Sequence, residues 1–218
     1  MKLLVTAGPT REPIDPVRYL SNRSSGKMGY AIACAALTRG HEVVLVSGPV
    51  ALAPPEGARV VRVTTSDEMF AAVHAWVGWA DVCVLCAAVA DFQPAKIETQ
   101  KIKKGNRATL TLELVPTRDI LLSLRDLPPA PGRTRAALVV GFAAETENVL
   151  AHAWAKLRTK GCALLVANDV SQEGVGFESD ENALTVLFAS GEERTLPRAT
   201  KMALASDLLK IFEEIVKL

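Results

Sequence analysis

The opening of the chain constrains the fold most, because it reads as a strand, a long loop, a helix and a second strand. Residues 3–7 are an apolar run that stops at a Gly-Pro pair, which predicts a buried strand ending in a turn. A polar loop with three prolines follows, and then Ser24 or Ser25 can cap a helix that begins near Gly26 and is rich in alanine. Residues 41–46 are expected to begin a second strand. This order predicts a Rossmann-like, doubly wound α/β fold with a mainly parallel sheet.

The loop and helix of this unit favour a bound anion. A helix N-terminus exposes backbone N–H groups and carries partial positive charge. Gly8, Gly26 and Gly29 would let a ligand approach the backbone closely. The loop also exceeds the usual strand-to-helix connection of about 2–6 residues, and such loops usually carry function. A phosphate is the expected ligand, although an ordinary crossover with nothing bound is the alternative that these residues leave open.

The two common phosphate motifs do not fit. Gly26 and Gly29 supply only the last pair of the dinucleotide G-x-G-x-x-G pattern, and no acidic residue follows the second strand. A P-loop is excluded because Met28 follows Lys27 where serine or threonine is required. The pattern indicates a nucleotide site of another kind.

The rest of the chain continues the same fold, and we expect residues 1–218 to form a single domain. One excursion, the arm at about residues 92–115, leaves the strand–helix rhythm. Its second half alternates strictly from residue 108 and predicts a strand with one wet face, which could pair with a second chain. A hairpin around Ser190 and a last helix at about residues 198–217 close the chain, with Met202 and Phe212 on the expected buried face.

The composition limits the kinds of partner that the chain is expected to bind. The net charge is +1 and aromatic residues are 5%, which gives no support to nucleic-acid binding. No apolar stretch is long enough for a membrane span, so a cytoplasmic protein is expected. Cys83 and Cys86 match C-x-x-C, but they lie in a predicted strand and face opposite sides, so they cannot share a metal.

Two further features are candidates for a chemical role. Asp91 follows the apolar run at residues 81–88, where ligands of open α/β sheets bind. Lys156 and Lys160 are four apart and therefore share one helix face, with Thr146 as the expected cap of that helix. From the residues alone, a solvated carboxylate and lysines paired with a helix end are the simpler explanations. The sequence shows no nucleophile–base pair. Its glycines, lysines, arginines, one aspartate and an amide suit reactions at phosphorus and acyl carbon.

Taken together, the motifs resemble the phosphopantothenate–cysteine ligases of coenzyme A biosynthesis. The resemblance covers nearly the whole chain. Its most specific segments are residues 5–10, 21–29, 87–91, 101–104, 141–146 and 167–171. It implies that a carboxylate of 4'-phosphopantothenate attacks a nucleoside triphosphate and releases pyrophosphate. The acyl-nucleotide then reacts with the amine of L-cysteine, releasing the nucleoside monophosphate.

The resemblance also assigns roles to residues. Asn22 matches the amide that contacts the acyl intermediate, and Arg18 matches a contact to the substrate's phosphate or carboxylate. Lys101 matches the flap lysine that meets the α-phosphate, while Gly8 and Ala88 line the intermediate's pocket. The positions that match nucleotide contacts are Ala87, Asp91, Lys101, Thr117, Arg118, Asp119, Ile120, Phe142, Lys156 and Lys160. Thr117-Arg118 departs from the Asn-Pro that family members commonly carry there, which weakens the assignment of base contacts.

The expected cofactors and partners follow from the same resemblance. Mg²⁺ would be held by Asp91 and the nucleotide, which is CTP in the bacterial branch and usually ATP in the eukaryotic branch. No flavin is expected in this chain, but fusion or association with a flavin-dependent decarboxylase is, as is a homodimer formed near the arm. Whether the chain stands alone or is a clipped domain stays open. The alternative functions are a nicotinamide- or flavin-dependent oxidoreductase and a non-catalytic nucleotide-binding module.

Overall fold

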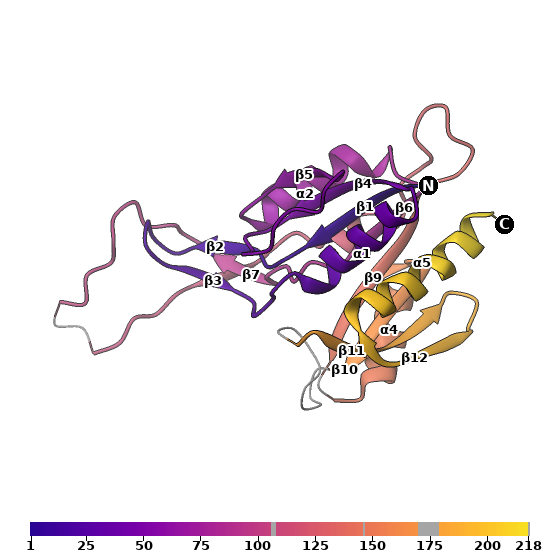
Figure 1. Cartoon of the computed structure of the whole chain (residues 1–218). Helices are drawn as coiled ribbons and strands as arrows, with labels where there is room; N and C mark the ends of the chain where they lie inside the picture. The colour runs from indigo at the N-terminus through magenta and orange to yellow at the C-terminus, as the bar shows by residue number, and fades with distance from the viewer. Residues whose placement is uncertain (106–107, 146, 170–178, 218) are drawn as a thin grey trace.

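The molecule is built on one eight-stranded sheet (Figure 1). The computed structural model describes residues 1–105, 108–145, 147–169 and 179–217. The strand order is β12-β11-β10-β9-β6-β1-β4-β5, and all neighbours are parallel except β10–β11 and β11–β12. The strands are β1 (Lys2–Ala7), β4 (Glu42–Ser47), β5 (Arg59–Arg62), β6 (Val82–Leu85), β9 (Leu138–Glu145), β10 (Leu164–Asp169), β11 (Glu181–Phe188) and β12 (Glu193–Thr200). The expected α/β fold with a terminal hairpin is confirmed.

The order of the strands reverses at β1. The chain first adds β4 and β5 on one side of β1 and later adds β6, β9 and β10 on the other. The carboxyl ends of β1 and β6 therefore flank a topological switch point, where open α/β sheets bind their ligands.

Helices cover both faces of the sheet. On one face lie α1 (Lys27–Thr38) and α5 (Lys201–Lys217), and on the other lie α2 (Ser66–Val77), α3 (Ile120–Ser123) and α4 (Val149–Lys160). Strand residues alternate between the two layers: Leu3 and Val5 pack under α1, whereas Leu4 packs toward α2. Each such buried side chain contributes about 1.5–3 kcal/mol, so these layers hold the loops at the sheet edge in place. Within the described ranges, every helix is too short or too polar to span a lipid bilayer.

The cysteines behave as the alternation predicts. Cys83 belongs to the core layer beneath α2, and Cys86 packs against the layer beneath α1. All four cysteines are free thiols, and no group of three His, Cys, Asp or Glu side chains in the described residues could hold a metal ion.

Two expectations about the helices are wrong. The residue before α1 is Gly26, in the left-handed conformation, and α1 has no side-chain cap. The Ser24 hydroxyl accepts from the Gly26 N–H, and the Ser25 hydroxyl accepts from the Lys27 N–H. Met202 is 49% exposed, because the buried stripe of α5 runs through Lys201, Leu204 and Leu208 at three- and four-residue spacing. Thr146 lies outside the described residues.

The polar loop and the arm form a lobe beside the sheet. The loop contains an antiparallel pair, β2 (Arg11–Pro13) and β3 (Tyr19–Ser21), and the arm is closed at its base by β7 (Phe92–Pro94) and β8 (Leu114–Pro116). Figure 1 shows the long connection between β7 and β8 extending away from the sheet beyond the β2–β3 pair. The strand expected at residues 108–115 is wrong except at its end, because the alternation there buries neither face.

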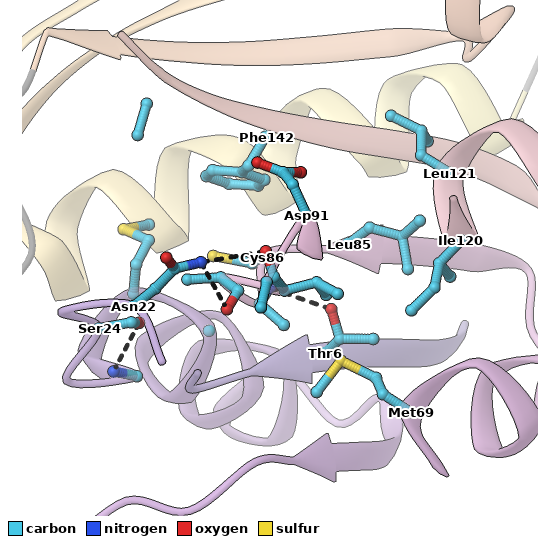
Figure 2. A pocket seen from close by; sticks show the side chains of 18 of the residues that line it. Thr6, Asn22, Ser24, Met69, Leu85, Cys86, Asp91, Ile120, Leu121 and Phe142 are labelled. Carbon is cyan, nitrogen blue, oxygen red and sulfur yellow. Dashed lines mark hydrogen bonds between the residues drawn. The ribbon is translucent and has the colours of Figure 1, made fainter. Parts of the chain in front are cut away.

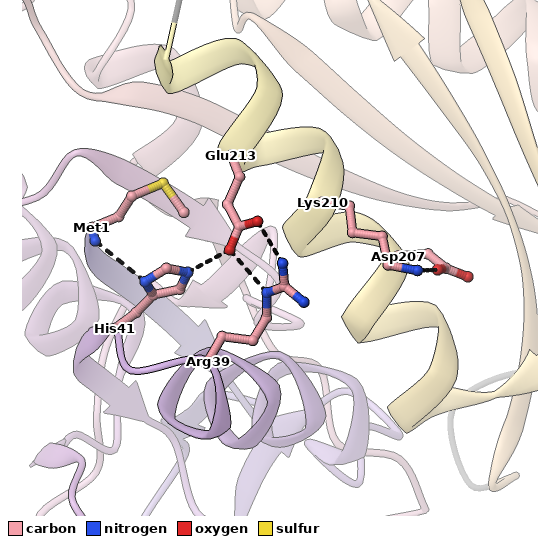
Figure 3. Close-up of polar contacts among 6 residues, drawn as sticks. All are labelled: Met1, Arg39, His41, Asp207, Lys210 and Glu213. Atoms are coloured by element: carbon pink, nitrogen blue, oxygen red, sulfur yellow. Dashed lines mark hydrogen bonds and ion pairs between the residues drawn. The ribbon is translucent and has the colours of Figure 1, made fainter.

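Ion pairs join the elements at the amino ends of the strands (Figure 3). Glu213 of α5 accepts from Arg39, at the end of α1, over 2.8 and 2.5 Å, and contacts the His41 ring nitrogen at 2.8 Å. The amino group of Met1 lies 3.3 Å from the other ring nitrogen of His41. A single carboxylate thus ties α5 to the α1–β4 connection.

Candidate functional site

A pocket of about 570 Å³ opens at the carboxyl edge of the sheet, at the switch point. Its walls are the segments that follow β1 and β6, the end of β9, the segment that leads into α3, one face of α4 and the first residues of α1 and α5. Of the residues predicted to form the site, it collects Asn22, Ala87, Ala88, Asp91, Thr117, Arg118, Asp119, Ile120, Phe142, Lys156 and Lys160. Residues far apart in sequence therefore face one cavity.

Backbone hydrogen bonds join the loops that leave β1 and β6. The Ala88 N–H donates to Gly8 O over 2.9 Å, and the Ala87 N–H donates to Thr6 Oγ1 over 3.1 Å. Thr10 Oγ1 accepts from the Ala90 N–H over 3.0 Å. Gly8 itself is not a lining residue; it supports the loop that carries Ala88.

The start of α1 packs against the end of β1 with no room for a side chain. A Cβ on Gly29 would lie 2.6 Å from Ala7 Cβ and 2.9 Å from Thr6 O. A Cβ on Gly26, whose φ is +77°, would lie 2.8 Å from Val50 Cγ1. These glycines bring the helix N-terminus to the pocket, as an anion site requires.

Asn22 is fixed by the loop after β6. Its Nδ2 donates to Ala88 O over 3.2 Å and to Val89 O over 3.0 Å, as Figure 2 shows. Both amide hydrogens are used in this way, so Oδ1 is the atom left to face a ligand, and it is an acceptor. Asn22 can therefore receive an N–H from a bound molecule.

The two lysines of α4 approach the pocket from its far wall. Lys156 Nζ donates to Phe142 O over 3.1 Å, and Lys160 forms an ion pair with Asp119. Burial would raise the pKa of Asp119, but hydrogen bonds from Lys160 and from the Leu122 N–H hold it below its usual value. In Figure 2, Phe142 and Asp91 point into the same space. Cations, an aromatic ring and a carboxylate thus share one wall.

The segment before α3 is held by its own contacts. Thr117 Oγ1 donates to Ala90 O over 2.6 Å. Arg118 pairs with Asp67 over 2.9 Å and stacks on Phe70 at 3.9 Å from the ring centroid. Arg118 lines the pocket, but its guanidinium already has a carboxylate partner, while Ile120 is buried beneath the segment.

Arg18 and Lys101 do not line the pocket. Arg18 donates to Asp15 and, over 2.7 Å, to Ile102 O in the arm, while the Ile102 N–H donates to Asp15 over 3.0 Å. The hydrogen bond from Arg18 holds the pKa of Asp15 well below its usual range, against the effect of burial. Asp15 thereby fixes Arg18 beside the residue that follows Lys101.

Asp15 was not among the predicted site residues. Its position between two prolines offered a signal, because an aspartate in such a turn accepts from the N–H groups that follow it. It does so here, from Val17 over 2.8 Å and Arg18 over 2.9 Å. Lys27, Asn168, Asn182 and Lys201 also line the pocket and had no predicted role.

Cys86 is the one cysteine that lines the pocket in the described chain. Burial raises its pKa to about 12. A thiol with such a pKa stays protonated at neutral pH and is a poor attacking group.

Comparison with known proteins identifies the family. The model of the "DNA/pantothenate metabolism flavoprotein C-terminal domain" matches residues 1–216. The chain belongs to this family. The resemblance found in the sequence is thereby confirmed at the level of the family.

Relatives in the family are longer proteins. The "Coenzyme A biosynthesis bifunctional protein CoaBC" of Escherichia coli K12 is 47% identical over 220 residues, which are 99% of this chain and 52% of that protein. The protein of the same name from Mycobacterium tuberculosis H37Rv is 47% identical over 213 residues, 95% of this chain and 51% of that protein. The chain spans about half the length of these relatives.

Two solved structures share the fold of this chain. The crystal structure of the C-terminal domain of CoaBC superposes with a TM-score of 0.82 at 40% identity, covering 99% of this chain and 95% of that one. A Cab2 mutant in complex with phosphopantothenate-cysteine superposes with a TM-score of 0.75 at 18% identity, covering 99% and 87%. At 18% identity, the similarity to the Cab2 structure shows only that the fold is shared.

Proposed function

We propose that the chain is a phosphopantothenate–cysteine ligase that acts in coenzyme A biosynthesis and uses CTP as its nucleotide. The observation that carries this proposal is the pocket itself, where the α4 lysines, Asp91 and a fixed Asn22 amide face one cavity at the switch point. Membership of a family whose relatives are named for coenzyme A biosynthesis supports it.

The first half-reaction forms an acyl-nucleotide. A carboxylate oxygen of 4'-phosphopantothenate bonds to the α-phosphorus, the bond from that phosphorus to the bridging oxygen breaks, and pyrophosphate leaves. Lys156 neutralises phosphate charge on one wall, beside the Lys160–Asp119 ion pair, and the N-terminus of α1 supplies N–H donors on another. Holding the reactants in register can remove roughly 7–11 kcal/mol of the barrier.

Asp91 is the residue that would hold Mg²⁺. It is an exposed carboxylate of the pocket, and the other pocket carboxylate, Asp119, is already paired with Lys160. One carboxylate fits this ion, because Mg²⁺ at nucleotide sites is commonly bound by one or two carboxylates plus the substrate's phosphates. The bound ion would neutralise phosphate charge.

The second half-reaction makes the amide bond. The cysteine nitrogen bonds to the acyl carbon, the bond from that carbon to the phosphate oxygen breaks, and the nucleoside monophosphate leaves while a proton departs from the nitrogen. Asn22 Oδ1 is placed to accept an N–H of the attacking amine, since both Nδ2 hydrogens already bond to loop carbonyls. Asn22 therefore acts mainly in this step.

The lobe supplies Arg18, from the polar loop, and Lys101, from the arm, in the proposed enzyme. Apolar side chains on the lobe are solvent-exposed in the single chain, among them Val17 at 58%, Phe92 at 52% and Ile97 at 54%. Several exposed apolar side chains on one lobe favour an interaction surface there. We propose a homodimer formed through this lobe, located in the cytoplasm and associated with a phosphopantothenoylcysteine decarboxylase.

The test is a reconstituted assay with 4'-phosphopantothenate, L-cysteine, Mg²⁺ and either CTP or ATP. CMP and pyrophosphate are expected with CTP, and an acyl-cytidylate is expected when cysteine is omitted. Asn22→Ala should let that intermediate accumulate, with ligation about 100-fold slower. Lys101→Gln should suppress its formation, whereas Lys103→Gln in the same arm serves as the matched control. Failure of the wild-type chain to form CMP would overturn the function, and normal turnover by both variants would overturn the roles.

A further inference from the structure

One buried carboxylate beside the arm has no part in the proposed chemistry. Asp15, in the connection from β2 to β3, is 3% exposed, and its two oxygens have different partners. Oδ1 accepts from the Val17 and Arg18 N–H groups and thereby shapes the local turn. Oδ2 accepts from the Arg18 side chain and, over 3.0 Å, from the N–H of Ile102, which lies 87 residues further along the chain. Oδ2 therefore links the polar loop to the arm.

The arm depends on this turn for its hydrogen bonds to the rest of the chain. In the described parts of residues 95–113, the hydrogen bonds that leave the arm all reach residues 14–18. The Glu98 N–H donates to Ile14 O over 2.9 Å, and Arg18 Nη2 donates to Ile102 O over 2.7 Å. The backbone of Ile102 is thus held on both sides, at its N–H by Asp15 and at its carbonyl by Arg18.

Apolar burial does little to fix the arm in the single chain. Ile97 and Leu110 are 54% and 48% exposed. A segment that buries few apolar side chains opens at a low free-energy cost, so its hydrogen bonds decide where it lies. Lys101 directly precedes Ile102, and the contacts that hold Ile102 therefore also set the position from which Lys101 extends.

We propose that Asp15 is a positioning residue: through its contact with the Ile102 N–H it fixes the arm, and thereby Lys101, for formation of the acyl-nucleotide. This inference rests on the proposed function, in which Lys101 meets the α-phosphate. The hydrogen bond from Arg18 holds the pKa of Asp15 well below its usual range, so the carboxylate stays charged at neutral pH. A charged acceptor forms stronger hydrogen bonds than a neutral one, which suits a contact that holds an exposed segment.

The variant Asp15→Asn separates the two oxygens. An asparagine that keeps its oxygen toward the turn places an NH₂ group, which donates, against the Ile102 N–H. The matched control is Asp81→Asn at the amino edge of the sheet. Asp81 also accepts from a backbone N–H, that of Lys2 over 2.7 Å, and also pairs with an arginine, Arg133. The same substitution at both sites distinguishes a loss of arm position from a general loss of stability.

Two measurements report on the arm. In Asp15→Asn, the Ile102 amide hydrogen should exchange with solvent at least about tenfold faster, as followed by NMR, because its acceptor is lost. At saturating CTP and 4'-phosphopantothenate without cysteine, acyl-cytidylate formation should slow at least about tenfold. In the Lys101→Gln background, Asp15→Asn should slow this step no further, because both residues act through one position. Asp81→Asn should change neither measurement.

The results separate the arm contact from the function. Further slowing of the Lys101→Gln protein by Asp15→Asn, or an unchanged exchange rate at Ile102, would overturn the proposal. Equal slowing by Asp81→Asn would also overturn it, because lost stability would then explain the effect. If Asp15→Asn does not fold, Ile102→Pro carries the kinetic test, since it removes the same N–H outside any helix or strand. If the wild-type chain forms no acyl-cytidylate, the proposed function fails and the catalytic role of Asp15 with it, whereas faster exchange at Ile102 would still show that Asp15 fixes the arm.

Discussion

The two edges of the sheet both hold charged residues but arrange them differently. At the amino edge, Asp81 accepts from the Lys2 N–H over 2.7 Å and pairs with Arg133, and Glu213 pairs with Arg39 and His41. These charges link elements of the fold to one another. At the carboxyl edge, lysines from three helices line a concave cavity. Balanced charges between elements indicate a structural role, whereas cations gathered around a cavity indicate a site for an anion.

Glycines show the same difference. Gly29 at the carboxyl edge has no space for a Cβ, whereas a Cβ on Gly40 at the amino edge would meet nothing within 4 Å. Close packing at Gly29 holds the α1 N-terminus against the pocket, while Gly40 only ends a helix turn with φ of +77°. A side chain at Gly29 would therefore displace α1 from the pocket, whereas a side chain at Gly40 would displace nothing.

Removing a lysine from the carboxyl edge should have the largest effect on activity and almost none on stability. For Lys156→Met we expect ligation to fall about 100-fold, because phosphate charge loses a fixed cation. Among the described residues Lys156 makes one hydrogen bond, to Phe142 O, so the melting temperature should change little. Initial rates with CTP and calorimetric melting of the same preparation measure the two effects. If Lys156→Met lost much stability and kept its kcat/KM, the charges at the carboxyl edge would have a structural role, contrary to the contrast drawn between the two edges.

Much of the fold follows from sequence pattern. The buried strands are continuous apolar runs, and Thr65 and Glu68 form the capping box that starts α2. The strand expected at 108–115 failed because alternation alone does not supply a partner strand or a core to bury one face. Met202 was misplaced because it lies outside the three- and four-residue spacing of Leu204, Leu208 and Phe212, which is the stripe that α5 buries.

Part of the site was predictable, because some of its residues lie in sequence motifs and others are brought together only by the packing of helices. Asn22, Asp91 and the α4 lysines sit in motifs that the resemblance covers, and the structure brings them to one pocket. Lys27 and Lys201 are 174 residues apart in sequence by difference of their numbers, and only the packing of α1 on α5 brings them to one wall. Asp15 acts through backbone contacts to the arm, which sequence spacing does not reveal.

Adding a methyl group at Gly29 tests the comparison of the two glycines. Its effect on activity should be smaller than that of Lys156→Met. Gly29→Ala forces a Cβ against Ala7 and Thr6, and overpacking of this kind costs about 1–3 kcal/mol, or about 2–12 °C in melting temperature. Activity should fall as well, because α1 must move away from the pocket. Gly40→Ala is the control: strain from its positive φ costs about 1–2 kcal/mol, but ligation should be unchanged. Equal loss of activity in both variants would show that distance from the pocket does not matter.

The smallest effect is expected at the amino edge, from Glu213→Gln. Hydrogen bonding from Arg39 lowers the pKa of Glu213 to about 2, against the effect of burial and with help from His41. Because the folded-state pKa lies below the unfolded value, this carboxylate stabilises the fold above about pH 4.5, and the contribution is lost as pH falls toward 2. At pH 7 the variant should melt about 2–4 °C lower, corresponding to about 1 kcal/mol, with unchanged ligation. Melting curves from pH 7 to pH 2 should show the two proteins converging in acid. If the difference persisted at pH 2, or if ligation fell at pH 7, the charges at this edge would have a role beyond joining α5 to the α1–β4 connection.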